Sequence, residues 1–122
     1  MFFISNLFIN EPSPILAGEI HIGPNLLLDG IAILYYEYSN NKYNALEYFE
    51  VDSGKYSFNI DPYNNFIVYA LPNSKYSFNY FPIYFPTYFG DELKWESSSK
   101  IHTNINIMDA DIYLESYDTL FY

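Results

Sequence analysis

The sequence contains no cysteine and no arginine, and each absence argues against a class of function. Without cysteine the chain can form no disulfide, offer no thiol nucleophile and build no cysteine-based zinc site. Five lysines stand against fifteen acidic residues, which gives a net charge of −10. Because phosphate binding needs a basic surface, this balance argues against a nucleic-acid partner and disfavours docking on an anionic membrane.

Long apolar runs and histidines are also scarce. No segment reaches the ~18 consecutive apolar residues that cross a bilayer, so we expect no direct membrane span. His21 and His102 are the two histidines, and we expect both to be surface residues rather than metal ligands. Residues 1–9 are apolar but lack the positive charge and small-residue cleavage site of a signal peptide. We therefore expect either that a secretion signal has been removed or that the chain is soluble by another route.

Aromatic side chains are abundant, at 22% of a chain of 122 residues that is half hydrophobic. This content predicts one folded domain rather than a disordered segment. We expect a β-sandwich domain over residues 15–116, an apolar N-terminal segment over residues 1–14 and an aromatic C-terminal tail over residues 117–122.

The chain alternates short strand patterns with turn residues. Residues 55–60, KYSFNI, alternate polar and apolar positions, which predicts a half-buried strand with Tyr56, Phe58 and Ile60 facing inward. The turn at residues 52–54, DSG, joins this strand to its predecessor as a hairpin. The expected strands cover residues 15–22, 31–36, 45–51, 55–60, 66–70, 101–107 and 108–115. These elements predict an all-β fold, a seven-stranded antiparallel sandwich of transthyretin-like or immunoglobulin-like type.

A long aromatic loop is expected before the last two strands. Residues 73–100 carry nine aromatic side chains, and their prolines, Pro82 and Pro86, oppose a central strand. We expect an ordered loop that folds over an open end of the sandwich. Tyr and Trp rings can stack on sugar faces or fill a pocket of a partner protein. The predicted binding residues are Tyr84, Tyr88 and Trp95, although the loop's rings could equally plug the core.

The sequence shows no catalytic constellation, so we predict that the protein is not an enzyme. Most of the carboxylates are expected to serve solubility on strand faces and turns. An isopeptide crosslink needs a lysine on an early strand and an asparagine on the last, whereas the first two expected strands carry no lysine and the last carries no asparagine. Calcium could use Asp109 with Asp111, but these acids form no recognised loop motif and are expected to face solvent. We therefore expect no metal and no cofactor.

Three features in fixed order indicate a family. The first pairs Gly18-Glu19-Ile20 with residues 30–35, GIAILY, and the second pairs residues 52–58, DSGKYSF, with residues 66–70, FIVYA. They resemble carboxypeptidase-regulatory-like and collagen-adhesin B-type repeats, which are transthyretin-like β-sandwich modules. The third feature runs from residues 84–91, YFPTYFGD, through Trp95 to residues 111–114, DIYL. It is similar to the tail of such modules in Bacteroidetes surface proteins, many of which the type IX secretion system exports.

The resemblance covers residues 15–115 and implies a location and a function. It implies a secreted or cell-surface protein on the exterior of a bacterial outer membrane. It also implies a non-enzymatic structural subunit of an envelope assembly, which binds other envelope proteins through its aromatic loop and edge strands. One alternative is an adhesive or carbohydrate-binding module with Tyr84, Tyr88 and Trp95 as a stacking platform for glycans. Another is an accessory domain of a hydrolase.

Overall fold

The computed structural model describes residues 13–73 and 84–116. The expectations for the C-terminal tail, for most of the N-terminal apolar segment and for the first part of the aromatic loop fall outside these residues. No helix within the described ranges has the length and apolar character needed to cross a bilayer.

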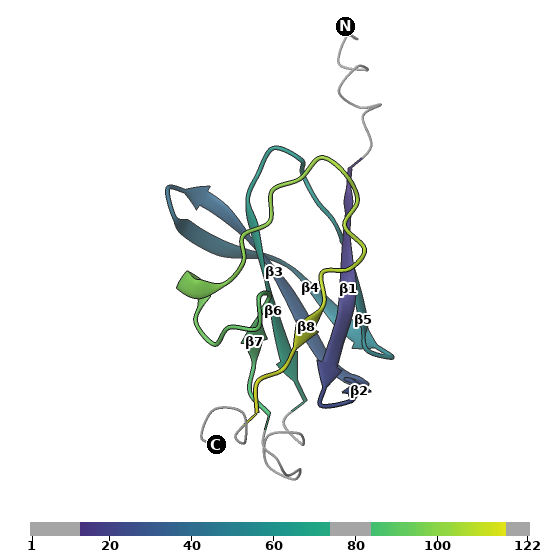
Figure 1. Ribbon diagram of the computed structural model, residues 1–122. Coiled ribbons are helices and arrows are strands. Elements are labelled where there is room, and N and C mark those ends of the chain that lie inside the picture. The colour runs from purple at the N-terminus through teal and green to yellow at the C-terminus, as the bar shows by residue number, and fades with distance from the viewer. Residues whose placement is uncertain (1–12, 74–83, 117–122) are drawn as a thin grey trace, which may run out of the picture.

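The described residues form an eight-stranded, mostly antiparallel sheet that curls into a half-barrel (Figure 1). This result confirms the predicted all-β class. The sequence pattern predicts seven strands in a sandwich, whereas the structure links eight strands in one sheet. The strands are β1 (Ile15–Ile22), β2 (Asn25–Leu26), β3 (Asp29–Ser39), β4 (Lys42–Asp52), β5 (Lys55–Asn59), β6 (Phe66–Pro72), β7 (Thr87–Tyr88) and β8 (Ile112–Tyr113).

Strand β3 is an interior strand of the sheet, and its apolar run is typical of such a strand. It pairs with β4 on one side and with β6 on the other, and both pairings are antiparallel. Ala32 and Leu34 have no solvent exposure, because neighbouring strands and the core cover them. The C-terminal end of β3 and the N-terminal end of β4 extend beyond the rest of the sheet as a two-stranded projection (Figure 1).

Strand β5 has the predicted alternation but a different main partner. Tyr56 and Phe58 are buried, and Gly54 takes the positive φ of 78° that its turn requires. Beyond the turn pair Asp52–Lys55, β5 separates from β4 and pairs with β1 instead. The expected hairpin is therefore present only at its turn, and the sheet curves where the two strands separate.

The regular strand predicted over residues 101–107 is wrong. The structure has isolated bridges at its two ends, from Ile101 to Phe66 of β6 and from Ile107 to Leu16 of β1. Between them Ile105 is 68% exposed, so the alternation of isoleucines does not report burial. The segment crosses from β6 to β1 (Figure 1), and a chain that crosses between two strands cannot follow either as a ladder.

The last predicted strand is shortened and runs parallel to its neighbour. Strand β8 contains two residues of the expected 108–115, and it pairs in parallel with Ile20 and His21 of β1. Ala110, Ile112 and Leu114 are nevertheless buried in the predicted period-two pattern. The burial pattern was readable from sequence, whereas the direction of pairing was not.

The final segment also contacts the opposite border of the sheet. The Phe85 N–H donates to the carbonyl of Glu115 over 2.9 Å, and Tyr84 forms a bridge with Ser116. Because this segment also pairs with β1, it connects the two borders of the half-barrel. The enclosed core consists of Leu16, Ile20, Ile22, Leu27, Ala32, Leu34, Val51, Tyr56, Phe58, Ile60, Phe66, Val68, Ala70, Ile101, Ala110, Ile112 and Leu114.

Candidate functional site

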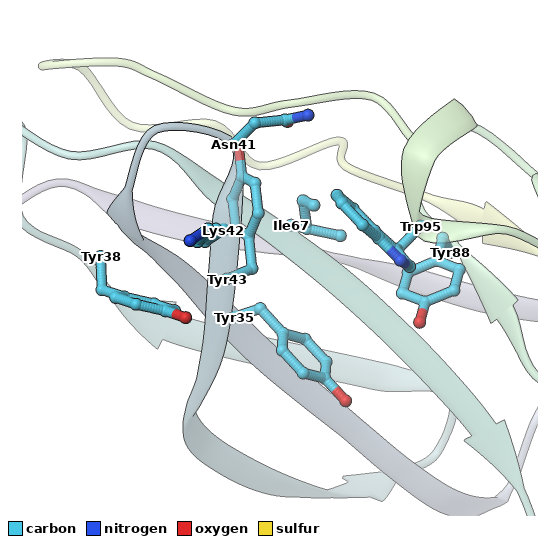
Figure 2. Close-up of a pocket in the computed structure, with 8 residues that line it drawn as sticks. All are labelled: Tyr35, Tyr38, Asn41, Lys42, Tyr43, Ile67, Tyr88 and Trp95. Atoms are coloured by element: carbon cyan, nitrogen blue, oxygen red, sulfur yellow. The ribbon is translucent and has the colours of Figure 1, made fainter.

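An open pocket of about 310 Å³ lies between the β3–β4 projection and the segment that follows β7 (Figure 2). We call it the aromatic pocket because five of its side chains are Tyr or Trp. Its lining consists of Tyr35, Tyr38, Asn41, Lys42, Tyr43, Ile67, Tyr88 and Trp95. Asn41 and Lys42 contribute polar groups to this largely aromatic surface, a combination found in ligand sites.

The β3–β4 hairpin supplies one wall of the aromatic pocket. Its turn residue Asn41 has a φ of 56°, a left-handed conformation that asparagine tolerates better than most residues. The Glu37 carboxylate accepts the Asn41 N–H and the Asn65 side-chain amide, each over 2.7 Å. The bonds from Asn65 and then Asn41 lower the pKa of Glu37, so the carboxylate remains ionised and fixes this end of the hairpin.

The opposite wall comes from the second half of the aromatic loop. Tyr88, in β7, stacks on Tyr69 of β6 with ring centroids 4.0 Å apart. Trp95 begins a short 3₁₀ turn, η1 (Trp95–Ser97), and its ring lies 6.1 Å from that of Tyr43 at 54°. Residues from distant parts of the sequence therefore meet at one surface, as Figure 2 shows.

Lys100 stabilises the η1 turn through hydrogen bonds to its backbone carbonyls. Its ammonium group bonds the carbonyls of Trp95, Glu96 and Ser98 at 3.2, 3.3 and 3.1 Å. The same nitrogen lies 6.0 Å from the Trp95 ring centroid, which is within reach of a cation–π interaction. The positively charged Lys100 ammonium group therefore lies beside the Trp95 indole and comes from the same segment of the chain.

The phenols of Tyr35, Tyr43 and Tyr88 stay neutral in ordinary buffers, because the pKa of each is raised. Burial raises the pKa of Tyr88 to about 12, and the neighbouring phenols of Tyr69 and Tyr35 add to the shift. Burial is also the main reason that the pKa values of Tyr35 and Tyr43 are raised. Neutral hydroxyls can both donate and accept hydrogen bonds, which suits a polar, uncharged ligand.

The structure places two of the three predicted binding residues on this pocket. Tyr88 and Trp95 line it, whereas Tyr84 packs against the hydrophobic core and forms the bridge to Ser116. Tyr84 therefore has the core-closing role that the sequence analysis kept as its alternative for the loop.

Three further tyrosines of the pocket were not singled out from the sequence: Tyr35, Tyr38 and Tyr43. Asn40 and Asn41 form the turn between β3 and β4, and asparagine is one of the residues that favour a tight turn. That signal would have paired the tyrosines on either side of the turn. It would not have placed them beside Trp95, which lies more than fifty residues further along the chain.

In comparisons with known proteins, the sequence matches no family model and no curated protein. The resemblance to transthyretin-like modules therefore remains an expectation from sequence motifs. The aromatic pocket is therefore the feature of this chain whose geometry and chemistry point to a function.

Proposed function

We propose that the protein is a non-enzymatic binding module whose aromatic pocket holds a neutral carbohydrate. The observation that carries this proposal is the meeting of Tyr35, Tyr43, Tyr88 and Trp95 at one open pocket with polar groups at its edge. Aromatic faces pack against the C–H faces of a sugar, while amide, ammonium and phenol groups bond its hydroxyls. Such a site needs no catalytic group.

The charges around the pocket favour an uncharged ligand. A cation in the pocket would be repelled by Lys42, which lines it. Lys100 already lies beside the Trp95 ring, where a cation would otherwise make a cation–π interaction. An anion would approach a protein of net charge −10. A neutral glycan experiences neither repulsion, because its hydroxyls carry no net charge.

Glycan binding can be tested with a glycan array followed by calorimetry on the sugars that bind. We expect Trp95→Ala to weaken binding by at least about tenfold, the loss of about 1.4 kcal/mol of stacking. Tyr48→Ala is the matched control, because Tyr48 is a 68% exposed aromatic residue of β4 that does not line the pocket. Equal losses in both variants, or no glycan bound by the wild type, would contradict the proposal.

A protein partner is the second candidate, and strand β4 favours it. Within the described residues, β4 pairs along β3 but meets β5 at a single residue pair, Asp52–Lys55. Its other edge is therefore open to an added strand. Leu46 and Tyr48 on the same strand are 52% and 68% exposed, and they offer apolar contacts beside that edge. This surface supports a structural subunit of a bacterial envelope assembly.

The partner hypothesis is tested by a tagged pull-down from detergent-solubilised envelopes. We expect stoichiometric recovery of specific envelope proteins, and Leu46→Lys on β4 should abolish it. Ile105→Lys, which makes the same kind of change at an exposed apolar residue outside β4, is the control. Recovery of the protein alone would contradict an envelope assembly and favour a free-standing glycan-binding module.

The finer fold assignment and the location belong to the same proposal. We infer a transthyretin-like module that acts on the exterior of the bacterial outer membrane or as a secreted protein. The all-β architecture is compatible with this assignment, and the sequence motifs at residues 52–58 and 84–91 support it. Surface labelling of intact cells with a membrane-impermeant reagent tests the location.

A further inference from the structure

Three potential metal ligands meet on β1 and on the segment that enters β8, strands that contribute no residue to the aromatic pocket. We propose that Glu19, His21 and Asp111 bind a divalent transition-metal ion of the Zn²⁺ type. The proposal is independent of the glycan site.

The strand pairing places these side chains together. Glu19 and His21 are two residues apart on β1, so they project from the same face of the strand. Asp111 precedes β8, which runs in parallel beside Ile20 and His21. One donor atom from each of the three residues lies within 4.8 Å of the other two.

The donor spacing suits tetrahedral coordination. Bonds of about 2.1 Å to nitrogen and oxygen place neighbouring donors about 3.4 Å apart. The His21 Nε2 and Glu19 Oε1 atoms are 3.5 Å apart, so this pair already has the required separation. The Asp111 carboxylate, with an oxygen within 4.8 Å of both donors, adds the third ligand of one tetrahedral face and leaves one position for water or another ligand.

The His21 nitrogen needs a partner that the described residues do not provide. Nε2 is buried and makes no hydrogen bond with any described residue, even though Glu19 lies close enough for an ion pair. A buried polar atom without a partner costs free energy, and a metal ion would supply the missing interaction. The Nε2 atom is one of the two ring nitrogens through which neutral histidine binds metals.

The surrounding groups hold the ligands in place. The His21 ring stacks on Tyr113 with centroids 4.3 Å apart, and the Asp91 carboxylate accepts the Tyr113 N–H over 2.8 Å. Asp111 Oδ1 accepts the Glu19 N–H over 2.8 Å, which leaves Oδ2 for a metal. Metal sites depend on such supporting contacts to fix the orientation of their ligands.

The ligand set selects the class of metal. One imidazole with two carboxylates suits Zn²⁺ and related transition ions, whereas Ca²⁺ prefers six to eight oxygen ligands. Two carboxylates also neutralise a divalent charge, and the net charge of −10 attracts cations to the surface.

The test is titration of the full-length protein with Zn²⁺ by calorimetry, together with thermal unfolding with and without the ion. We expect one Zn²⁺ per chain and a Tm that rises with Zn²⁺ concentration, because Asp111 joins the other ligands only in the folded chain. His21→Gln and Glu19→Gln should each weaken binding by at least about tenfold and remove the rise in Tm.

The chain offers a matched control in its second histidine. His102 is exposed, and its Nδ1 lies 2.8 Å from the side-chain oxygen of Asn65, so His102→Gln should leave Zn²⁺ binding unchanged. Circular dichroism without metal shows whether each variant is folded. Wild-type affinity in a folded His21→Gln variant, or no binding by the wild type, would overturn the proposal. The Co²⁺ complex should show absorption bands typical of tetrahedral coordination, and these bands should vanish in His21→Gln.

Discussion

Thr87 is a buried polar residue whose hydroxyl joins segments that lie far apart in the sequence. It donates to the Phe85 carbonyl over 2.8 Å and accepts the Glu115 N–H over 3.0 Å. Thr87→Val preserves the shape of the side chain but leaves both backbone groups without this partner. We expect unfolding in urea to show a loss of about 1–3 kcal/mol.

Thr103 provides the control for this measurement. Its hydroxyl makes the same two kinds of bond, but both go to Ile105 within one exposed turn. Water can replace these bonds, so Thr103→Val should change stability by no more than about 0.5 kcal/mol. Equal effects of the two substitutions would contradict the assigned role of Thr87.

Tyr56 is a buried phenol that makes the stability of the fold dependent on alkaline pH. Its hydroxyl donates to the Ala110 carbonyl, and burial followed by the Asp111 charge raises its pKa above the ordinary value of 10.0. A phenol with a raised pKa stabilises the folded state below pH 10, and this contribution is lost as the pH rises further. We expect the free energy of unfolding to fall above about pH 10 and to fall less steeply in Tyr56→Phe.

Urea unfolding at a series of alkaline pH values measures this dependence. Tyr48→Phe replaces an exposed tyrosine of β4 and serves as the control. A curve for Tyr56→Phe as steep as that of the wild type would show that Tyr56 does not carry the alkaline loss.

Strand β1 is confined between β5 and the segment that leads into β8, and Gly18 marks the closest approach. A side-chain carbon at Gly18 would overlap the backbone carbonyl of Ala110, which cannot rotate away as a flexible side chain can. Gly18→Ala should therefore displace the 107–113 segment and destabilise the protein by about 3 kcal/mol. Thermal unfolding measures the effect, with Ser57→Ala on the exposed face of β5 as the control. A Gly18→Ala variant as stable as the wild type would contradict this packing.

The strands that were predicted correctly can be recognised from the hydrophobic pattern of their own residues. Alternation at residues 55–60 and the apolar run at residues 31–36 reflect how each strand is buried, so the patterns are visible without knowledge of the partners. The alternation at residues 101–107 misled because this segment crosses between strands and leaves Ile105 exposed. The partner of β5 was not predictable either, because it depends on the curvature of the sheet.

Some residues of the candidate site can likewise be recognised from their local sequence, whereas others reach it only through packing between distant segments. Tyr88 and Trp95 stood out because they lie in an aromatic, proline-containing stretch, and both line the pocket. Tyr35 and Tyr43 had no distinguishing local pattern, and their part in the pocket arises from packing between distant segments. The proximity of Glu19, His21 and Asp111 could not be predicted for the same reason, since Asp111 reaches β1 through pairing across about ninety residues of chain.

The charge of the whole molecule sets how its stability responds to salt. Fifteen acidic residues outnumber five lysines, so at least ten carboxylates have no lysine of their own, since 15 − 5 = 10. Their mutual repulsion opposes the compact state, and added salt screens it. The Debye length shortens from about 30 Å at about 10 mM salt to about 8 Å at about 150 mM, which is less than the width of a domain.

We therefore expect the Tm to rise by about 3 °C over this range of NaCl, since about 1 kcal/mol corresponds to a few degrees for a chain of this size. The double variant Glu47→Lys and Glu50→Lys changes two exposed positions of β4 and lowers the net charge from −10 to −6, since −10 + 4 = −6. Its Tm should depend less on salt, because less repulsion remains to be screened. Calorimetric scans of both proteins at each salt concentration provide the comparison. A wild-type Tm that falls with salt would mean that attractive ion pairs outweigh the repulsion, and equal slopes would show that the effect does not come from net charge.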